Sequence, residues 1–163
     1  MVYLSDKVVF HVDANVILNY LNEDDPDLCE IVKRKIIFRK NWGNDVYKIN
    51  VYAIGEIARR LITVKTVNDD LLQKINKIKK LVKDKYFKLI RIDDIGYDWV
   101  KHFKKINELD TRIEYADKFN IALFCADMDA KFFYTFDKDI IKSEKINEYI
   151  KTIDPPRSIK EMQ

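Results

Sequence analysis

Two short, nearly continuous apolar runs predict β-strands that are covered on both faces. They are Val8–Val12 and Lys131–Phe136. Runs of this kind, in contrast to alternating ones, are typical of parallel strands with helices on both sides of the sheet. Weaker candidates are Val46–Ile49, Leu89–Ile92 and, as an edge strand, Tyr149–Ile153. The pattern predicts a mainly parallel sheet of about five short strands.

Between these runs, apolar residues recur every three or four positions, as on one face of a helix. The clearest case is Leu71–Val82, which follows Asn68 and Asp69. Further helices are expected after Pro26, after a cap at Asn50, behind Asp94 with Trp99 and Phe103, and over Phe119–Ala126. Helices that alternate with parallel strands imply right-handed crossovers. We therefore predict an α/β fold, a three-layer α/β/α sandwich.

The length of the chain predicts a single domain. Its 163 residues are only slightly more than the roughly 150 residues of a typical domain. Hydrophobic residues make up 47% of the chain, with only three glycines and three prolines, so a compact core is expected rather than a disordered chain. We expect the domain to span residues 1–154, and residues 155–163, which begin with two prolines, to form a short loose tail.

Cysteine usage and hydropathy indicate a cytoplasmic protein with no membrane partner. Cys29 and Cys125 form no C-x-x-C pattern and no disulfide framework, so they are interpreted as small core residues in a reducing compartment. The segment Met1–Lys7 lacks the basic flank and apolar stretch of a signal peptide. No apolar run approaches the ~20 residues that cross a bilayer.

Acidic residues fall where two predicted strands end. Asp13 terminates the first run and Asp137 follows the second. Because the carboxyl ends of parallel strands meet at one rim of the sheet, both carboxylates are expected there. Asp117 is expected at the same rim, since it begins the helix that leads back into the second run. Glu56 lies about 9 Å along the helix that follows Asn50.

Four carboxylates at one rim repel one another and lose hydration unless a cation neutralises them. Oxygen ligands suit Mg²⁺ or Mn²⁺, ions that commonly work with phosphate oxygens. The pattern therefore predicts hydrolysis of a phosphate ester by a water that the metal activates. Taken singly, each acid has another interpretation: Asp13 as a turn residue, Asp117 as a first-turn acid that the helix dipole favours, and Glu56 as the ion-pair partner of Arg59 or Arg60.

The ordered set of these motifs resembles the PIN-domain ribonucleases, which include the VapC-type toxins. The resemblance extends from Val8 to Ile153 and rests on Asp13 with Asn15, on Glu56, on Asp117 and on Thr135 with Asp137. It implies metal-dependent endonucleolytic cleavage of RNA, with Asp13, Glu56, Asp117 and Asp137 as metal-binding acids and Asn15 and Thr135 as supporting residues. It also implies a homodimer that a small antitoxin protein inhibits.

The chain departs from the family pattern in two respects. Ala14 stands where threonine or serine is common, and Asp129 and Asp139 are further acids near the last strand. Glu114, three residues before Asp117, is a fifth acid near the expected rim. Whether these additional acids contribute to the site stays open.

Two other classes of function remain as alternatives. A phosphatase of the haloacid dehalogenase type ends its first strand in Asp-x-Asp, whereas this chain has Asn15 at the second position. A non-catalytic module could keep the fold and bind nucleic acid or protein without turnover.

Basic and aromatic residues offer further candidates for RNA contact. The net charge of +3 identifies no partner, but seven lysines lie between Lys74 and Lys88, and a second basic stretch runs from Lys33 to Lys40. These stretches could follow an RNA backbone or could be solvated helix faces. Trp42, Tyr20, Tyr47 and Tyr52 could stack on bases or pack in the core. His11 and His102 have no partners at metal-ligand spacing, and we interpret them as structural or solvated.

Overall fold

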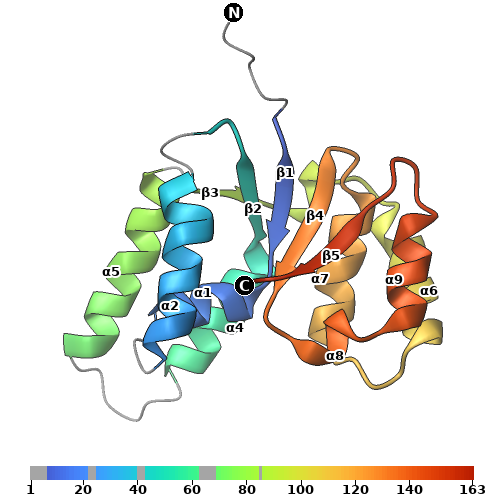
Figure 1. The fold of residues 1–163 in the computed structure, drawn as a ribbon. Helices are drawn as coiled ribbons and strands as arrows, with labels where there is room; N and C mark the ends of the chain where they lie inside the picture. The colour runs from blue at the N-terminus through green and yellow to red at the C-terminus, as the bar shows by residue number, and fades with distance from the viewer. Residues whose placement is uncertain (1–6, 22–24, 40–42, 63–68, 85) are drawn as a thin grey trace, which may run out of the picture.

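Five parallel strands form one sheet in the order β3-β2-β1-β4-β5 (Figure 1). The computed structural model describes residues 7–21, 25–39, 43–62, 69–84 and 86–163. The strands are β1 (Val9–Val12), β2 (Val46–Asn50), β3 (Phe87–Ile90), β4 (Ala130–Thr135) and β5 (Ser158–Glu161). Because β1 lies between β2 and β4, its carboxyl end opens between two crossover connections, where ligands bind in open parallel sheets.

Helices cover both faces of this sheet (Figure 1). The first set is α1 (Ala14–Leu21), α2 (Pro26–Val32), the π-helical continuation η1 (Lys33–Phe38), α4 (Val51–Ile62) and α5 (Asp69–Lys83). After β3 come the short η2 (Ile92–Asp94), then α6 (Trp99–Leu109), α7 (Tyr115–Ala126), α8 (Lys138–Ile141) and α9 (Glu144–Lys151). Figure 1 places α1, α2, α4 and α5 on one side of the sheet and α6, α7 and α9 on the other.

Two hydrophobic cores fill the space between these layers. Alternate residues of β1 enter different cores, since Phe10 and Val12 pack with α1, α2, α4 and α5, whereas Val9 packs with α6, α7 and α9. This alternation is the normal geometry of a strand that is covered on both faces. The structure confirms the predicted three-layer α/β/α sandwich with a five-stranded parallel sheet.

Helix caps lie where the sequence places them. Asn50 ends β2, and its Oδ1 accepts a hydrogen bond of 2.8 Å from the backbone N–H of Ala53, in the first turn of α4. Asp25 caps α2 in the same way through the N–H of Leu28, at 3.1 Å, directly before Pro26. The helices after Pro26 and Asn50 are therefore confirmed.

The C-terminal segment differs from the prediction. Residues 149–151 end the helix α9 and do not form a strand, because Ile146 and Ile150 are buried at helical spacing. The fifth strand is β5, whose register with β4 runs from Ser158 beside Phe132 to Glu161 beside Thr135. The prediction of a loose end after Asp154 is therefore wrong. The strand predicted at Leu89–Ile92 is β3, two residues earlier.

Buried Arg157 explains why the segment after Asp154 is ordered. Its guanidinium donates hydrogen bonds to the backbone carbonyls of Pro155, at 2.8 Å, and Asp127, at 2.9 Å. Met162, at the other end of β5, is also buried, and its N–H donates to the carbonyl of Thr135. Residues 155–163 thus contribute to the sheet.

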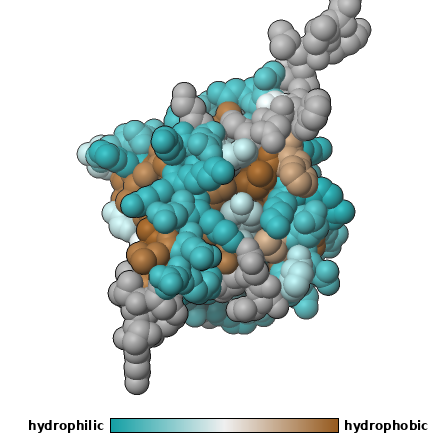
Figure 2. Space-filling model, turned by 90° about the vertical axis from the view of Figure 1, so that its left-hand side faces the viewer, coloured by the Kyte–Doolittle hydropathy of each residue, from teal (hydrophilic) through white to brown (hydrophobic). Residues whose placement is uncertain are grey.

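The face that carries α2 and α5 is mostly polar, with smaller apolar patches between the polar side chains (Figure 2). Lys79, Lys80 and Lys83 of α5, which belong to the basic stretch between Lys74 and Lys88, are exposed. Their exposure agrees both with contact to an RNA backbone and with a solvated helix face. Lys40 of the other stretch lies outside the described residues, as does Trp42. Among the helices that the structure describes, none combines the length and apolar character that a bilayer crossing needs.

Candidate active site

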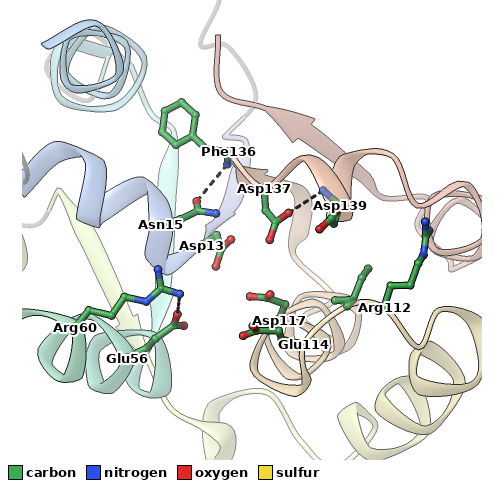
Figure 3. Close-up of a pocket in the computed structure, with 11 residues that line it drawn as sticks. Asp13, Asn15, Glu56, Arg60, Arg112, Glu114, Asp117, Phe136, Asp137 and Asp139 are labelled. Atoms are coloured by element: carbon green, nitrogen blue, oxygen red, sulfur yellow. Dashed lines mark hydrogen bonds and ion pairs between the residues drawn. The ribbon is translucent and has the colours of Figure 1, made fainter. Parts of the chain in front are cut away.

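A pocket of about 420 Å³ opens at the carboxyl ends of β1 and β4 and brings together the four predicted carboxylates (Figure 3). Asp13, Glu56, Asp117 and Asp137 reach it from four different elements. We call it the acidic pocket. Its lining residues are Asp13, Asn15, Glu56, Arg60, Arg112, Ile113, Glu114, Asp117, Phe136, Asp137 and Asp139.

Three of the four acids lie at the start or end of an element, and Glu56 lies within a helix. Asp13 follows β1, and its N–H donates to the carbonyl of Tyr134 on the neighbouring strand at 3.0 Å. Asp137 caps α8, with its Oδ1 accepting from the N–H of Asp139 at 2.8 Å. Asp117 lies in the first turn of α7, as the helix and strand lengths predict, and Glu56 lies in the second turn of α4.

Asp13 is the most deeply buried acid of the pocket, at 2% exposure. Its Oδ2 accepts a hydrogen bond of 2.8 Å from the hydroxyl of Thr135, and its Oδ1 accepts one of 2.8 Å from the N–H of Ala14. Both hydrogen bonds favour the ionised form, but burial outweighs them and raises the pKa of Asp13 to about 6. The nearby carboxylates of Glu56 and Asp137 act in the same direction as burial.

Thr135 and Asn15 connect the two strand ends. The Thr135 hydroxyl accepts from the amide of Asn15 at 3.1 Å and from the N–H of Asp137 at 2.9 Å, while it donates to Asp13. The Asn15 carbonyl oxygen accepts from the N–H of Phe136 at 3.2 Å (Figure 3). Both residues therefore lie where the resemblance implies supporting side chains, and they hold Asp13 and Asp137 in fixed relation.

Asp117 experiences the repulsion within the pocket most directly. Burial has the largest effect, and together with the carboxylates of Asp13, Asp137, Glu56 and Glu114, in that order, it raises the pKa of Asp117 to about 7. A carboxyl group with this pKa is only partly ionised near neutral pH. The acidic pocket is thus a region where negative charge is costly and a cation would be stabilised.

Glu56 makes an ion pair along its own helix. Arg60 Nη2 lies 2.7 Å from Glu56 Oε1, one helical turn further on (Figure 3). This is the arrangement that the alternative interpretation of Glu56 describes, with Arg60 rather than Arg59 as the partner. The pair lies in the wall of the acidic pocket, so Glu56 faces the other carboxylates as well.

Two of the three additional acids line the acidic pocket, and the third does not. Glu114, the residue before α7, and Asp139, in the first turn of α8, both line the acidic pocket. Asp129 is exposed in the turn between α7 and β4 and does not line it. Glu114 was not assigned to the site from the sequence, although its position just before the helix of Asp117 is a signal that could have placed it there.

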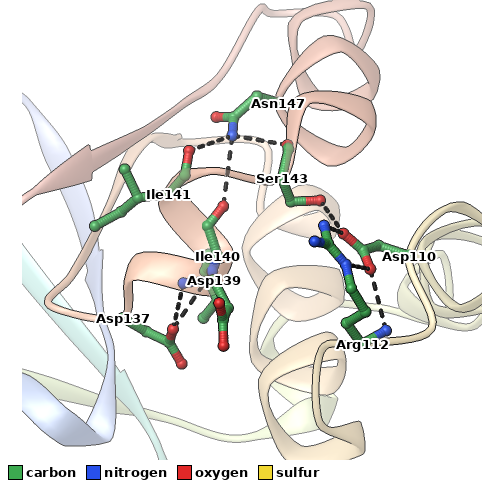
Figure 4. A network of polar contacts seen from close by, with 8 residues as sticks. All are labelled: Asp110, Arg112, Asp137, Asp139, Ile140, Ile141, Ser143 and Asn147. Carbon is green, nitrogen blue, oxygen red and sulfur yellow. Dashed lines mark hydrogen bonds and ion pairs between the residues drawn. The ribbon is translucent and has the colours of Figure 1, made fainter.

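Sequence reasoning missed Arg112, which also lines the pocket. Its guanidinium is held by Asp110 through hydrogen bonds of 3.0 and 2.7 Å, and Asp110 also accepts from the hydroxyl of Ser143 at 2.7 Å (Figure 4). These donors hold the pKa of Asp110 well below its ordinary range. The network connects the loop before α7 with the start of α9 and fixes one edge of the pocket.

The donor chemistry of the pocket fits a hard divalent cation. All four predicted ligands offer carboxylate oxygens. The pKa values of Asp13 and Asp117 are raised first by burial and then by neighbouring carboxylates, whose repulsion a cation would relieve. Within the described residues, no three His, Cys, Asp or Glu side chains are arranged to hold a metal ion as they stand. Mg²⁺ usually keeps several waters and takes only one or two protein carboxylates, so a ready-made cage of three is not required.

The histidines and cysteines lie away from this chemistry. His11 is buried, with Nε2 2.7 Å from Asp127 Oδ2, an oxygen that also accepts from the Lys48 ammonium at 2.6 Å. His102 Nδ1 lies 2.8 Å from the hydroxyl of Tyr149. The two cysteines are free and buried, and burial raises the pKa of Cys125 to about 12, as expected for a structural thiol. The buried pair of Lys48 with Asp127 was not foreseen from the sequence.

Solved structures resemble this fold over most of the chain. VapBC2 from Rickettsia felis, bound to a DNA fragment from their promoter, aligns over 96% of this chain and 100% of the matched chain, with a TM-score of 0.61 and 13% identity. FitAcB from Neisseria gonorrhoeae aligns over 78% of this chain and 87% of the matched chain, with a TM-score of 0.52 and 13% identity. No family model matches the sequence, and no curated protein matches it significantly. The likeness shows that the chain has a PIN-like fold.

Proposed function

We propose that this protein is a metal-dependent endoribonuclease that hydrolyses RNA phosphodiester bonds in the acidic pocket. The observation that carries the proposal is the convergence of Asp13, Glu56, Asp117 and Asp137 from four elements in one pocket. Acids that repel one another in a partly buried pocket reduce stability, which favours a functional explanation for their placement. The PIN-like fold supports the same function by analogy.

In this mechanism Asp13, Asp117 and Asp137 would hold the cation, either directly or through its waters, and the hydroxyl of Thr135 orients the carboxylate of Asp13. When bound there, Mg²⁺ or Mn²⁺ would lower the pKa of a water and neutralise charge on the phosphate. Glu56 is placed to orient the attacking water or to hold a second cation. Arg60, beside Glu56, offers donors to the phosphate oxygens.

The biological setting that we propose is a toxin of a toxin-antitoxin pair. Two observations support this setting. The fold is similar to a chain of VapBC2, and the pattern of acidic residues resembles that of VapC-type toxins. A small antitoxin protein would then be a partner, and a homodimer the functional assembly. RNA is the substrate in this proposal.

A phosphatase of the haloacid dehalogenase type has less support. Asn15, at the second position of the expected Asp-x-Asp, uses both ends of its amide in hydrogen bonds to Thr135 and to the N–H of Phe136. It therefore contributes to the framework of the pocket and offers no second carboxylate for a phosphoryl-transfer step. A non-catalytic PIN-like module remains the alternative that an activity assay decides.

The test is incubation of the purified protein with single-stranded and structured RNA in Mg²⁺, in Mn²⁺ or in chelator, with mapping of the cut ends. Internal cleavage that requires the metal is expected. Asp117→Asn should lower the rate by roughly a hundredfold, since it removes a carboxylate of the proposed cation site.

Asp129→Asn is the matched control, because Asp129 is an exposed acid outside the pocket. It should cleave as the wild type does. Cleavage that persists in chelator, or that Asp117→Asn leaves unchanged, contradicts the proposed site.

A further inference from the structure

An aromatic groove of about 500 Å³ opens beside the acidic pocket. Its walls carry five aromatic side chains from α4, α6 and α7, which are Tyr52, Trp99, Phe103, Tyr115 and Phe119. We call it the aromatic groove. The volume lies within the ~300 to 1,000 Å³ that is usual for small-molecule and cofactor sites.

Three of the five rings pack edge to face, which leaves ring surface available. Phe119 packs against Tyr52 and against Trp99, with ring centroids 4.9 and 5.2 Å apart and planes at 81° in both pairs. Tyr52 is nevertheless 55% exposed and Tyr115 is 70% exposed. These are large apolar surfaces for rings in one concave site, and flat ligands can stack on them.

Trp99 contributes its indole ring to the same wall. Its indole N–H is covered by protein atoms and has no hydrogen-bond partner among the described residues. The contribution of Trp99 to the groove is therefore its ring and not this donor. Nucleobases have flat aromatic faces that suit a wall of this kind.

The groove and the acidic pocket adjoin each other. Glu56 lines both, and Ala116 of the groove is the neighbour of Asp117. Tyr52 precedes Glu56 by four residues on α4, about 6 Å along the axis. One strand of RNA can therefore place a base in the groove while a phosphate of the same strand lies at the acidic pocket.

We infer that the aromatic groove binds an unpaired RNA base next to the phosphate that is cleaved. This inference rests on the proposed function and adds to it a preference for single-stranded RNA. Proximity to the phosphate-binding chemistry favours a base over an apolar protein segment as occupant. Stacking on Tyr52 or Tyr115 is tolerant of sequence because every base has a π-face.

The test uses Trp99 as its own reporter. The chain has two tryptophans, so Trp42→Phe leaves Trp99 as the single indole. This protein is titrated with a short unpaired oligoribonucleotide, with Ca²⁺ in place of Mg²⁺ to slow cleavage. The comparison ligand is an abasic oligomer of equal length, which keeps the phosphates and lacks the bases.

The oligoribonucleotide is expected to change Trp99 emission, and the abasic oligomer to bind at least about tenfold more weakly. Tyr52→Ala and Tyr115→Ala should each weaken binding by about tenfold, and Tyr52→Phe, which keeps the ring, should bind as the wild type does. Tyr97→Ala is the control, since Tyr97 is 88% exposed and lies outside the groove.

Equal binding of the abasic oligomer, or no effect of either alanine variant, overturns the inference. So does a Trp99 signal that follows protein concentration without RNA, because the groove would then be covered by a second copy of the chain. Failure of the nuclease proposal looks different: the wild type would cleave no RNA in any metal, while the base-dependent Trp99 signal would persist.

Discussion

The hydroxyl of Thr135 takes part in three hydrogen bonds at the acidic pocket. It donates to Asp13 and accepts from Asn15 and from the N–H of Asp137. These three hydrogen bonds join the ends of β1 and β4 to the start of α8. A change of one hydroxyl group therefore affects two of the four carboxylates.

Thr135→Val is expected to lower the free energy of unfolding by about 1 to 3 kcal/mol, because it keeps the shape and leaves the buried carboxylate of Asp13 without its donor. Urea unfolding measures this loss. Thr111→Val, at an exposed threonine, is the control and should change stability by less than about 0.5 kcal/mol. Equal stability of both variants would show that the Thr135 network carries no net energy.

Asp117→Asn is expected to stabilise the metal-free protein above neutral pH. The pKa of Asp117 in the folded protein, about 7, is above its ordinary value of 3.8. The favourable contribution of the protonated carboxyl is therefore complete below about pH 3.8 and is lost as the pH rises through about 7. Asn stays neutral, so the gain of the variant over the wild type should grow between pH 4 and pH 8.

Thermal unfolding in chelator at pH 4, 6 and 8 measures this difference. Asp117 is the better position for the experiment than Asp13, since Asp13 accepts two hydrogen bonds that an amide would not fully replace. A constant difference between variant and wild type at all three pH values would contradict the assigned repulsion.

At the level of elements, local patterns were enough for most of the fold. The continuous apolar runs became β1 and β4, and the periodic segment after Asn68 became α5. The strand β5 could not be predicted in this way. Its four residues contain one hydrophobic residue, Ile159, and its position depends on the distant contacts of Arg157 and Met162.

Arg157→Met is expected to loosen β5 while the rest of the sheet stays folded. The change removes both hydrogen bonds of the buried guanidinium and leaves the carbonyls of Asp127 and Pro155 without this donor, at a cost of about 1 to 3 kcal/mol. Hydrogen exchange of the amides in β5 should become faster than in β1. Lys151→Met, at an exposed cation at the end of α9, serves as the control and should leave β5 protected. Unchanged exchange in β5 of the Arg157 variant would show that strand pairing alone holds it.

At the scale of the whole molecule, topology explains why the site residues could be predicted. Parallel strands and the helices that return to them bring Asp13, Asp137 and Asp117 to one rim whatever the detailed packing. The ion pair of Glu56 with Arg60, the placement of Arg112 and the aromatic groove depend on side-chain packing between distant elements. Such contacts leave no periodic signal in the sequence.

The most direct measurement of the central claim is a calorimetric titration of Mn²⁺ into the metal-free protein. If the acids of the pocket form one cation site, the wild type binds Mn²⁺, and Asp13→Asn and Asp117→Asn each weaken binding by at least about tenfold. Asp129→Asn should bind as the wild type does. Mn²⁺ affinity that is absent in the wild type, or that is the same in all four proteins, would contradict the account.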